Sequence, residues 1–175
     1  MIDYALRYPI GKSDYSEPVL QKDRADRIAA IRELPLELTL ALRGLNEKQL
    51  NSPYRDGGWT VKQVVHHLCD AGAVLYLRTK QVLMEDCPKV IPYDDHKMLA
   101  MADGDSSIDS AMKLIDGLHT RWAVVFESLS VDQFHRKYVH FERGEESLDK
   151  LLAYAAWHSR HHTAHITALR GRMNW

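Results

Sequence analysis

Four stretches of the chain repeat apolar residues at spacings of three and four, which is the period of one face of an α-helix. These stretches cover residues 19–43, 60–84, 108–129 and 148–169. Each predicts a helix of about 20 residues or more. The first helix is expected to kink or restart at Pro35, because proline has no backbone N–H to donate.

Short polar signals divide the chain between these helices. Capping boxes, in which a Ser, Thr or Asn precedes a Gln by three residues, are predicted at three places: Asn46 with Gln49, Thr60 with Gln63, and Ser130 with Gln133. Residues 1–17 are expected to form an extended or coiled lead-in. Residues 86–107 are expected to be irregular, with a helical turn near 97–101. Residues 138–146 are expected to form a loop or a brief strand-like excursion.

Together these elements predict an all-α protein in which residues 1–175 form a single domain, with no convincing sheet. A chain of 175 residues is long enough to bury a core of its own. Long antiparallel helices around one core predict a four-helix bundle of the up-down type, with one or two longer crossovers. Bundles of this kind commonly build metal sites from side chains on facing helices.

The last of the four stripes is unusual because histidines occupy its centre. It runs through Leu148, Leu151, Ala155, His158, His162, His165 and Leu169. A polar group that is buried without a partner costs about 1–3 kcal/mol. Several imidazoles on a core-facing stripe therefore need partners, and a metal ion would satisfy their nitrogens at once.

His158 and His162 are the leading candidate ligands, because residues four apart on a helix project from the same face. His67, from the second long helix, is the natural third ligand. Three neutral imidazoles leave coordination positions open for water or substrate, which is typical of a catalytic rather than a closed structural site. Imidazole suits zinc, nickel, copper or iron, so the residues by themselves leave the metal open.

The neighbouring histidines compete with this set. His165 shares the stripe but lies two turns from the first ligand, so it is expected to support a ligand or to bond the backbone. His161 is turned toward Trp157 and is expected to be structural. His66 lies about 100° around its helix from His67, so the two cannot point at one centre from equivalent positions. His66 is expected to be solvated or at an interface.

The chain has ten histidines in all, a high count for its length. His119, together with Trp122, could line the same cavity from the third long helix. The remaining histidines are scattered and are expected to be ordinary: His96, His135 and His140.

The residues around the histidines leave the chemistry open and assign no catalytic side chain. The H-E-x-x-H pattern of zinc proteases would need a glutamate where this chain has Ser159, and nothing in the sequence places Asp70 or Glu127 at the metal. A bound ion could lower the pKa of a water for hydrolysis. It could instead deprotonate a small thiol that attacks an electrophile. A third alternative is a non-catalytic bundle whose histidines bind metal adventitiously or form a dimer interface.

Composition excludes several other classes of protein. The net charge is −1 with neutral histidines, so nothing draws the chain to nucleic acid or to an anionic membrane. The apolar run at residues 73–77 is far too short to span a bilayer, and the N-terminus lacks the pattern of a secretory signal. Cys69 and Cys87 form no C-x-x-C motif and are expected to be reduced thiols of a cytoplasmic protein.

Several motifs give the chain a family resemblance over nearly its whole length. They are P-Y-R-D-G-G-W-T-V-K-Q-V-V-H-H-L at 53–68, Y-A-A-W-H-S-R-H-H-T-A-H-I at 154–166, Y-P-I-G at 8–11, I-P-Y-D at 91–94 and G-L-H-T-R-W at 117–122. With these motifs the chain resembles the DinB/YfiT-like superfamily and, within it, the YfiT-type metal-dependent hydrolases.

The resemblance implies a four-helix bundle, usually a homodimer, with one divalent metal per chain. Matched residue by residue, the family's ligands fall on His67, His158 and His162; zinc is the favoured metal and nickel the alternative. The implied activity is a hydrolase acting on a small-molecule substrate. Related members are transferases or isomerases that use a low-molecular-weight thiol such as bacillithiol or mycothiol. The segments 54–59 and 91–95 are expected to shape the pocket.

Overall fold

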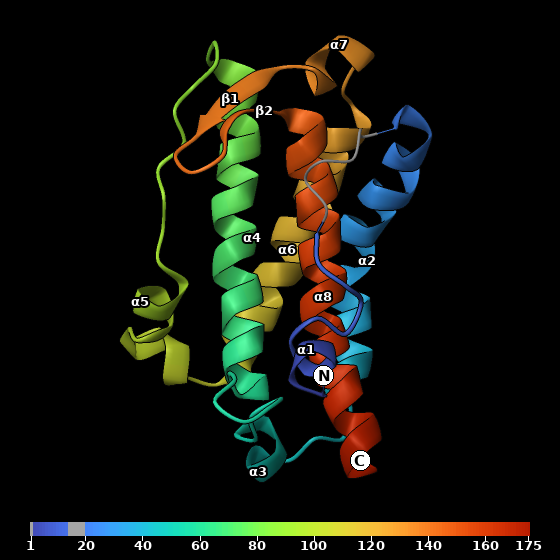
Figure 1. Cartoon of the computed structure of the whole chain (residues 1–175), viewed down its shortest axis with the longest axis vertical. Coiled ribbons are helices and arrows are strands. Elements are labelled where there is room, and N and C mark those ends of the chain that lie inside the picture. Colours follow the sequence, from blue (N-terminus) through green and yellow to red (C-terminus); the bar gives the residue numbers. More distant parts are fainter. Residues whose placement is uncertain (1, 14–19) are drawn as a thin grey trace.

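Four long helices form the body of the molecule, which was analysed as a computed structural model that describes residues 2–13 and 20–175. The helices are α2 (Arg24–Leu42), α4 (Val61–Met84), α6 (Ile108–Glu127) and α8 (Leu148–Met173). They pack into a single bundle, as Figure 1 shows. The predicted four-helix bundle is therefore confirmed.

Shorter elements connect the long helices and pack around them. The helical ones are α1 (Ile2–Arg7), η1 (Gln21–Asp23), α3 (Glu47–Leu50), α5 (Asp95–Leu99), η2 (Ala102–Asp105) and α7 (Val131–Phe134). All three predicted capping boxes form, and each closes with hydrogen bonds in both directions between the cap residue and the glutamine. These boxes could be predicted because each one depends only on residues three apart in the sequence.

Two local expectations differ from the structure. The N-terminal lead-in is not wholly extended, because α1 occupies residues 2–7; residues 14–17 lie outside the described part of the chain. The strand-like excursion expected at 138–146 does form, as β1 (Lys137–His140) and β2 (Gly144–Ser147), but the two strands also pair into a small antiparallel hairpin, which was not expected. The hairpin is held at one side by Tyr138, which is buried and donates a hydrogen bond to Glu146 across the pair.

Helix α2 continues through Pro35, so of the two expected outcomes, a kink or a restart, the restart does not occur. A residue with an N–H at this position would donate to the carbonyl of Ile31, one turn earlier. That carbonyl instead accepts a hydrogen bond from Nδ1 of His119 on α6, at 3.0 Å. The His119 side chain thus replaces the backbone N–H that Pro35 lacks, and the helix continues.

The helices do not alternate in direction as an up-down bundle would. An ion pair between Arg24 and Asp149 joins the starts of α2 and α8, and Arg170 donates to the carbonyl of Ala41 near their ends. Hence α2 and α8 are parallel neighbours. Helices α4 and α6 also run parallel, both upward in Figure 1, and Trp122 donates to Thr79 between them.

This arrangement places α2 opposite α4 and α6 opposite α8 in the bundle. Helix α2 packs on α6 and α8, and α4 packs on the same two helices. The long segment 85–107 returns along the outside of α4, so that α6 can start at the same end as α4 (Figure 1). The prediction of long crossovers is thus correct, while the alternating directions are not.

Two apolar clusters fill the two ends of the bundle, and histidines lie between them. Along α8, Ala155 is the last member of one cluster and Ile166 the first of the other, with buried histidines in the gap. Along α6, His119 lies between Ile115 and Trp122, which belong to different clusters. The core is therefore interrupted by a polar layer at mid-height.

Candidate metal centre

Three histidines converge at the middle of the bundle. His67 comes from α4, and His158 and His162 come from successive turns of α8. One ring nitrogen of each lies within 4.8 Å of the others, and the Nε2 atoms of His67 and His158 are 2.9 Å apart. All three side chains are buried. The structure therefore brings together the three residues that were predicted from the sequence.

The donor set fits a transition-metal ion. Two imidazole nitrogens that each bind an ion at about 2.1 Å lie about 3.4 Å apart in a tetrahedral site, so the Nε2 atoms of His67 and His158, 2.9 Å apart, need to separate by only about 0.5 Å to hold one. Burial, followed by the neighbouring histidines, lowers the pKa of His67 to about 3. Burial likewise holds the pKa of His158 and of His162 well below the usual range. The rings are therefore neutral at pH 7 and offer lone pairs.

Asp95 stands behind His67 on the side away from this centre. Its Oδ1 atom lies 3.7 Å from Nδ1 of His67, while Nε2 of that ring faces His158. The same oxygen is buried and has no hydrogen-bond partner among the described residues. Burial raises the pKa of Asp95 above that of a solvated carboxyl group. A carboxylate behind a ligating imidazole fixes its orientation and tautomer, and Asp95 is placed for that role.

Trp59 covers the centre from the loop before α4. Its ring centroid lies 4.6 Å from that of His67 and 6.0 Å from that of His162. The segments 54–59 and 91–95 were expected to shape the pocket, but the individual roles of Trp59 and Asp95 could not be assigned from the sequence. Both residues lie in irregular chain, where no periodicity shows which side chain points inward.

Comparisons with known proteins identify the family of this chain. The model of the DinB superfamily matches residues 30–166, a range that includes all three histidines. The chain belongs to the DinB superfamily. It is 43% identical over 170 residues to a Bacillus cereus (strain B4264) protein named "Putative metal-dependent hydrolase", covering 97% of this chain and 98% of that one.

Two further relatives give the same picture of the superfamily. A Bacillus thuringiensis subsp. konkukian (strain 97-27) protein of the same name is 42% identical, with the same coverage. The solved structure of YfiT from Bacillus subtilis matches with a TM-score of 0.93 and 37% identity, over 98% of this chain and 99% of that one. YfiT is described as a probable metal-dependent hydrolase with an unusual four-helix bundle topology.

A second histidine group on α8 competes for an ion in this DinB-superfamily bundle. Ring nitrogens of His161, His162 and His165 also lie within 4.8 Å of one another. However, Nε2 of His165 donates to the carbonyl of Arg7 at 3.0 Å, and His161 stacks on Trp157 with ring centroids 4.4 Å apart. Both residues thus have the backbone and structural roles that were expected of them.

The remaining histidines lie outside both groups. His66 was expected to be solvated or at an interface, and this was wrong: it is 6% exposed, and its Nε2 lies 3.2 Å from the carbonyl oxygen of Ser106. The crossover 85–107 covers that face of α4. His119 lies beside Trp122, but its Nδ1 donates to the backbone of α2, and neither residue is among those that line the cavities beside the centre. His96 is exposed beside Trp59.

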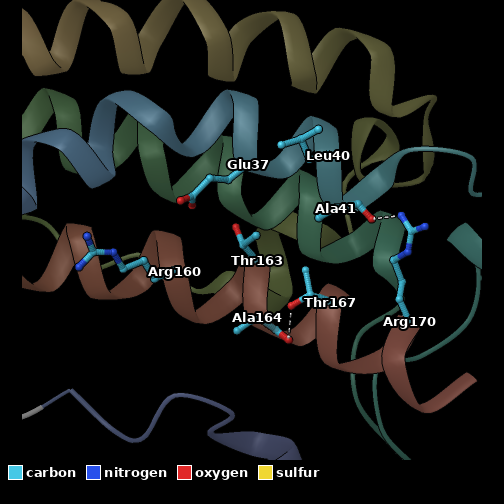
Figure 2. A pocket seen from close by; sticks show the side chains of 8 residues that line it. All are labelled: Glu37, Leu40, Ala41, Arg160, Thr163, Ala164, Thr167 and Arg170. Carbon is cyan, nitrogen blue, oxygen red and sulfur yellow. Dashed lines mark hydrogen bonds between the residues drawn. The ribbon is translucent and has the colours of Figure 1, made fainter. Parts of the chain in front are cut away.

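Three cavities differ in their relation to the histidines. A groove of about 550 Å³ lies between α2 and α8 and contains none of the candidate ligands (Figure 2). A smaller cavity of about 210 Å³ lies between α4, α8 and the hairpin. Its wall includes Asp95, next to His67, and Tyr154, whose ring centroid is 5.5 Å from that of His158. The smaller cavity therefore adjoins the centre from the side of the hairpin, while a cavity of about 440 Å³ lined by Trp59 and His96 adjoins it from the side of the loop before α4.

Within the described residues, none of the helices has the length and apolar character that a bilayer-spanning segment requires.

Proposed function

We propose that this protein is a metal-dependent hydrolase, in which one divalent metal ion is held by His67, His158 and His162. The observation that carries the proposal is the convergence of three buried, neutral imidazoles from two helices, 2.9 Å apart at their closest nitrogens. The names of the relatives support it. Zinc is the favoured metal and nickel the alternative, because both accept imidazole ligands.

The residues of the chain divide the work around that ion. When bound, the ion would lower the pKa of a water molecule and supply hydroxide at neutral pH. The three imidazoles hold the centre in place without contributing charge. Asp95 orients His67 from behind, and Trp59 shields the rings from solvent. A dry, rigid surrounding of this kind strengthens every electrostatic interaction with a reacting group.

A thiol-dependent transferase is the second candidate function, and one observation favours it. A protease-type site would place a carboxylate base directly after His158, but this position is Ser159, whose hydroxyl donates to the carbonyl of Ala155 within its own helix. The residue therefore cannot act as a base at the centre. A thiol that gives up its proton on binding to a metal ion needs no such base.

One set of assays separates these functions and tests both. The purified chain should hold about one zinc or nickel ion, and the ion should be lost in His67→Ala. Zinc-loaded protein should then hydrolyse activated esters or amides without added thiol. Turnover that appears only with a low-molecular-weight thiol, giving a thioether product, would replace the hydrolase by the transferase. A protein that binds no ion at micromolar zinc would contradict both functions and leave the non-catalytic bundle.

We also propose that the protein is a homodimer, as the family resemblance implies, and that it is located in the cytoplasm. Sedimentation equilibrium of the metal-loaded chain tests the dimer: a single species of about twice 20.1 kDa is expected. A monomer at all concentrations would contradict it.

A further inference from the structure

Arg78 is a buried charge for which the described residues provide no counter-charge. The residue is only 9% exposed, on α4. Its guanidinium donates to the carbonyl of Ile91 at 2.6 Å and faces the ring of Tyr93 at 5.3 Å. No carboxylate pairs with it in the parts of the chain that the structure describes. A buried arginine is normally paired, because an isolated charge is costly to remove from water.

The guanidinium lines a cavity that adjoins the metal centre. Arg78 and Asp95 both belong to the wall of the 210 Å³ cavity between α4, α8 and the hairpin. Arg78 is eleven residues beyond His67 on the same helix, so their Cα atoms are about 16 Å apart along its axis. Side chains on a helix lean toward its N-terminus, so a long arginine side chain on α4 leans toward the centre. A small molecule in the cavity can therefore contact Arg78 at one end and approach the histidine centre, beside Asp95 and Tyr154, at the other.

The other charged groups of the wall are already engaged. Arg143 donates to Glu146 at 2.6 Å, so this pair is neutral as a unit. Asp95 directs its buried oxygen at His67. Glu142 lies at the exposed rim of the hairpin. Arg78 is thus the one cavity-lining cation, among the described residues, whose only polar acceptor is a backbone carbonyl.

From this placement we propose that Arg78 is the anion-binding residue of the substrate pocket, and that the substrate carries a carboxylate or a similar planar anion at the end remote from the metal. The inference rests on the proposed function for the position of the reacting end. Arginine suits this role because its planar fork matches a carboxylate with two parallel hydrogen bonds. Tyr93, Tyr138 and Tyr154 also line this cavity of about 210 Å³, which limits the substrate to a small molecule.

Binding of simple acids to the zinc-loaded protein tests the proposal. A monocarboxylate such as butyrate can bind the metal alone, whereas linear dicarboxylates longer than malonate, up to suberate, can also reach Arg78. We expect one of the longer diacids to bind about tenfold or more tightly than the monoacid of equal length, since a charge-assisted pair contributes at least that factor. Isothermal titration calorimetry measures both. Malonate serves as a reference, because it can chelate the metal without reaching the arginine.

Arg78→Met should abolish this preference and leave butyrate binding and zinc content unchanged. Arg78→Lys keeps the charge but not the fork, so it should retain only part of the preference; it is also the variant to use if the methionine variant does not fold. Arg32→Met, which removes an exposed guanidinium paired with Glu127, is the matched control and should bind every acid as the parent protein does.

The outcomes separate the two proposals. Equal affinity for monoacids and diacids in the parent protein, or a preference that survives in Arg78→Met, would overturn the anion subsite. Acid binding that depends on Arg78 but not on zinc would contradict the metal centre and leave the subsite standing. Acid binding that depends on zinc but not on Arg78 would overturn the anion subsite and leave the metal centre standing.

Discussion

Helix α8 carries two pairs of histidines with the same spacing but different surroundings. His158 and His162 are four apart, as are His161 and His165, and all four side chains are buried. The first pair meets His67 of α4 at the centre of the bundle. The second pair meets a backbone carbonyl and aromatic rings from the N-terminal segment and from α8 itself.

The difference shows that a spacing of four lets two histidines bind one ion. The element packed against them decides whether they meet a third ligand or a backbone acceptor. A ring nitrogen that donates to a carbonyl fixes the tautomer of its ring, as Arg7 does for His165. A ring that faces another neutral imidazole, as His158 does, gains most from a shared cation. Measurements of metal binding and stability on matched variants of the two pairs test this contrast.

The largest expected difference is in metal affinity. His162→Ala removes one of three ligands and should weaken zinc binding by more than about 100-fold, which exceeds the typical loss when a supporting residue is removed. His165→Ala should leave the affinity unchanged, because its Nε2 is engaged by Arg7. Competition with a chromophoric chelator measures both constants. Similar losses in His165→Ala and His161→Ala, with zinc retained in His67→Ala, would move the ion to the second group.

A smaller loss of zinc affinity is expected when the carboxylate behind His67 is removed. Asp95→Asn keeps the size of the side chain but removes the charge that faces Nδ1 of His67, 3.7 Å away. Zinc affinity should fall about 10- to 100-fold. Asp94→Asn is the matched control, since Asp94 is exposed and caps α5 through an oxygen that asparagine also possesses. If the two variants bind zinc equally, Asp95 does not support the ligand.

These two tests separate what the sequence could predict from what it could not. His158 and His162 could be found because they occupy a helical stripe, and His67 because it lies on the buried side of another helix. Asp95 could not be found, because its contact with His67 depends on how the crossover 85–107 folds back on α4. The parallel course of α4 and α6 was missed for the same reason: helix periodicity contains no information about direction. Local capping boxes needed no such long-range information and were correct.

The second pair should matter for stability rather than for metal. His165→Ala leaves the carbonyl of Arg7 without its donor and removes the ring that stacks on Tyr54, with centroids 3.9 Å apart. The free energy of unfolding should fall by about 1–3 kcal/mol, because the variant loses both the hydrogen bond and the stacking of a buried ring. Urea unfolding of metal-free protein measures it. His96→Ala, at an exposed position, is the control and should change stability by less than about 0.5 kcal/mol.

The smallest expected effect concerns His119, a buried histidine that belongs to neither pair. Burial lowers its pKa to about 4 in the folded protein, against about 6.5 for a solvated histidine. Between these values the unfolded chain binds a proton that the folded chain does not, so stability is fully present above about pH 6.5 and is lost as the pH falls toward 4. His119→Gln removes the titration but keeps an N–H for the Ile31 carbonyl that Pro35 leaves free.

The glutamine variant should therefore lose less stability than the parent between pH 7 and pH 5, by about 1–2 kcal/mol. Urea unfolding in the presence of a chelator measures this without a contribution from metal release, and His96→Gln controls for the substitution itself. A variant with an unchanged pH dependence would mean that His119 is not the group whose protonation opposes folding. A variant that also loses helix content would show instead that α2 depends on the imidazole itself to continue past Pro35, and that glutamine cannot reach Ile31.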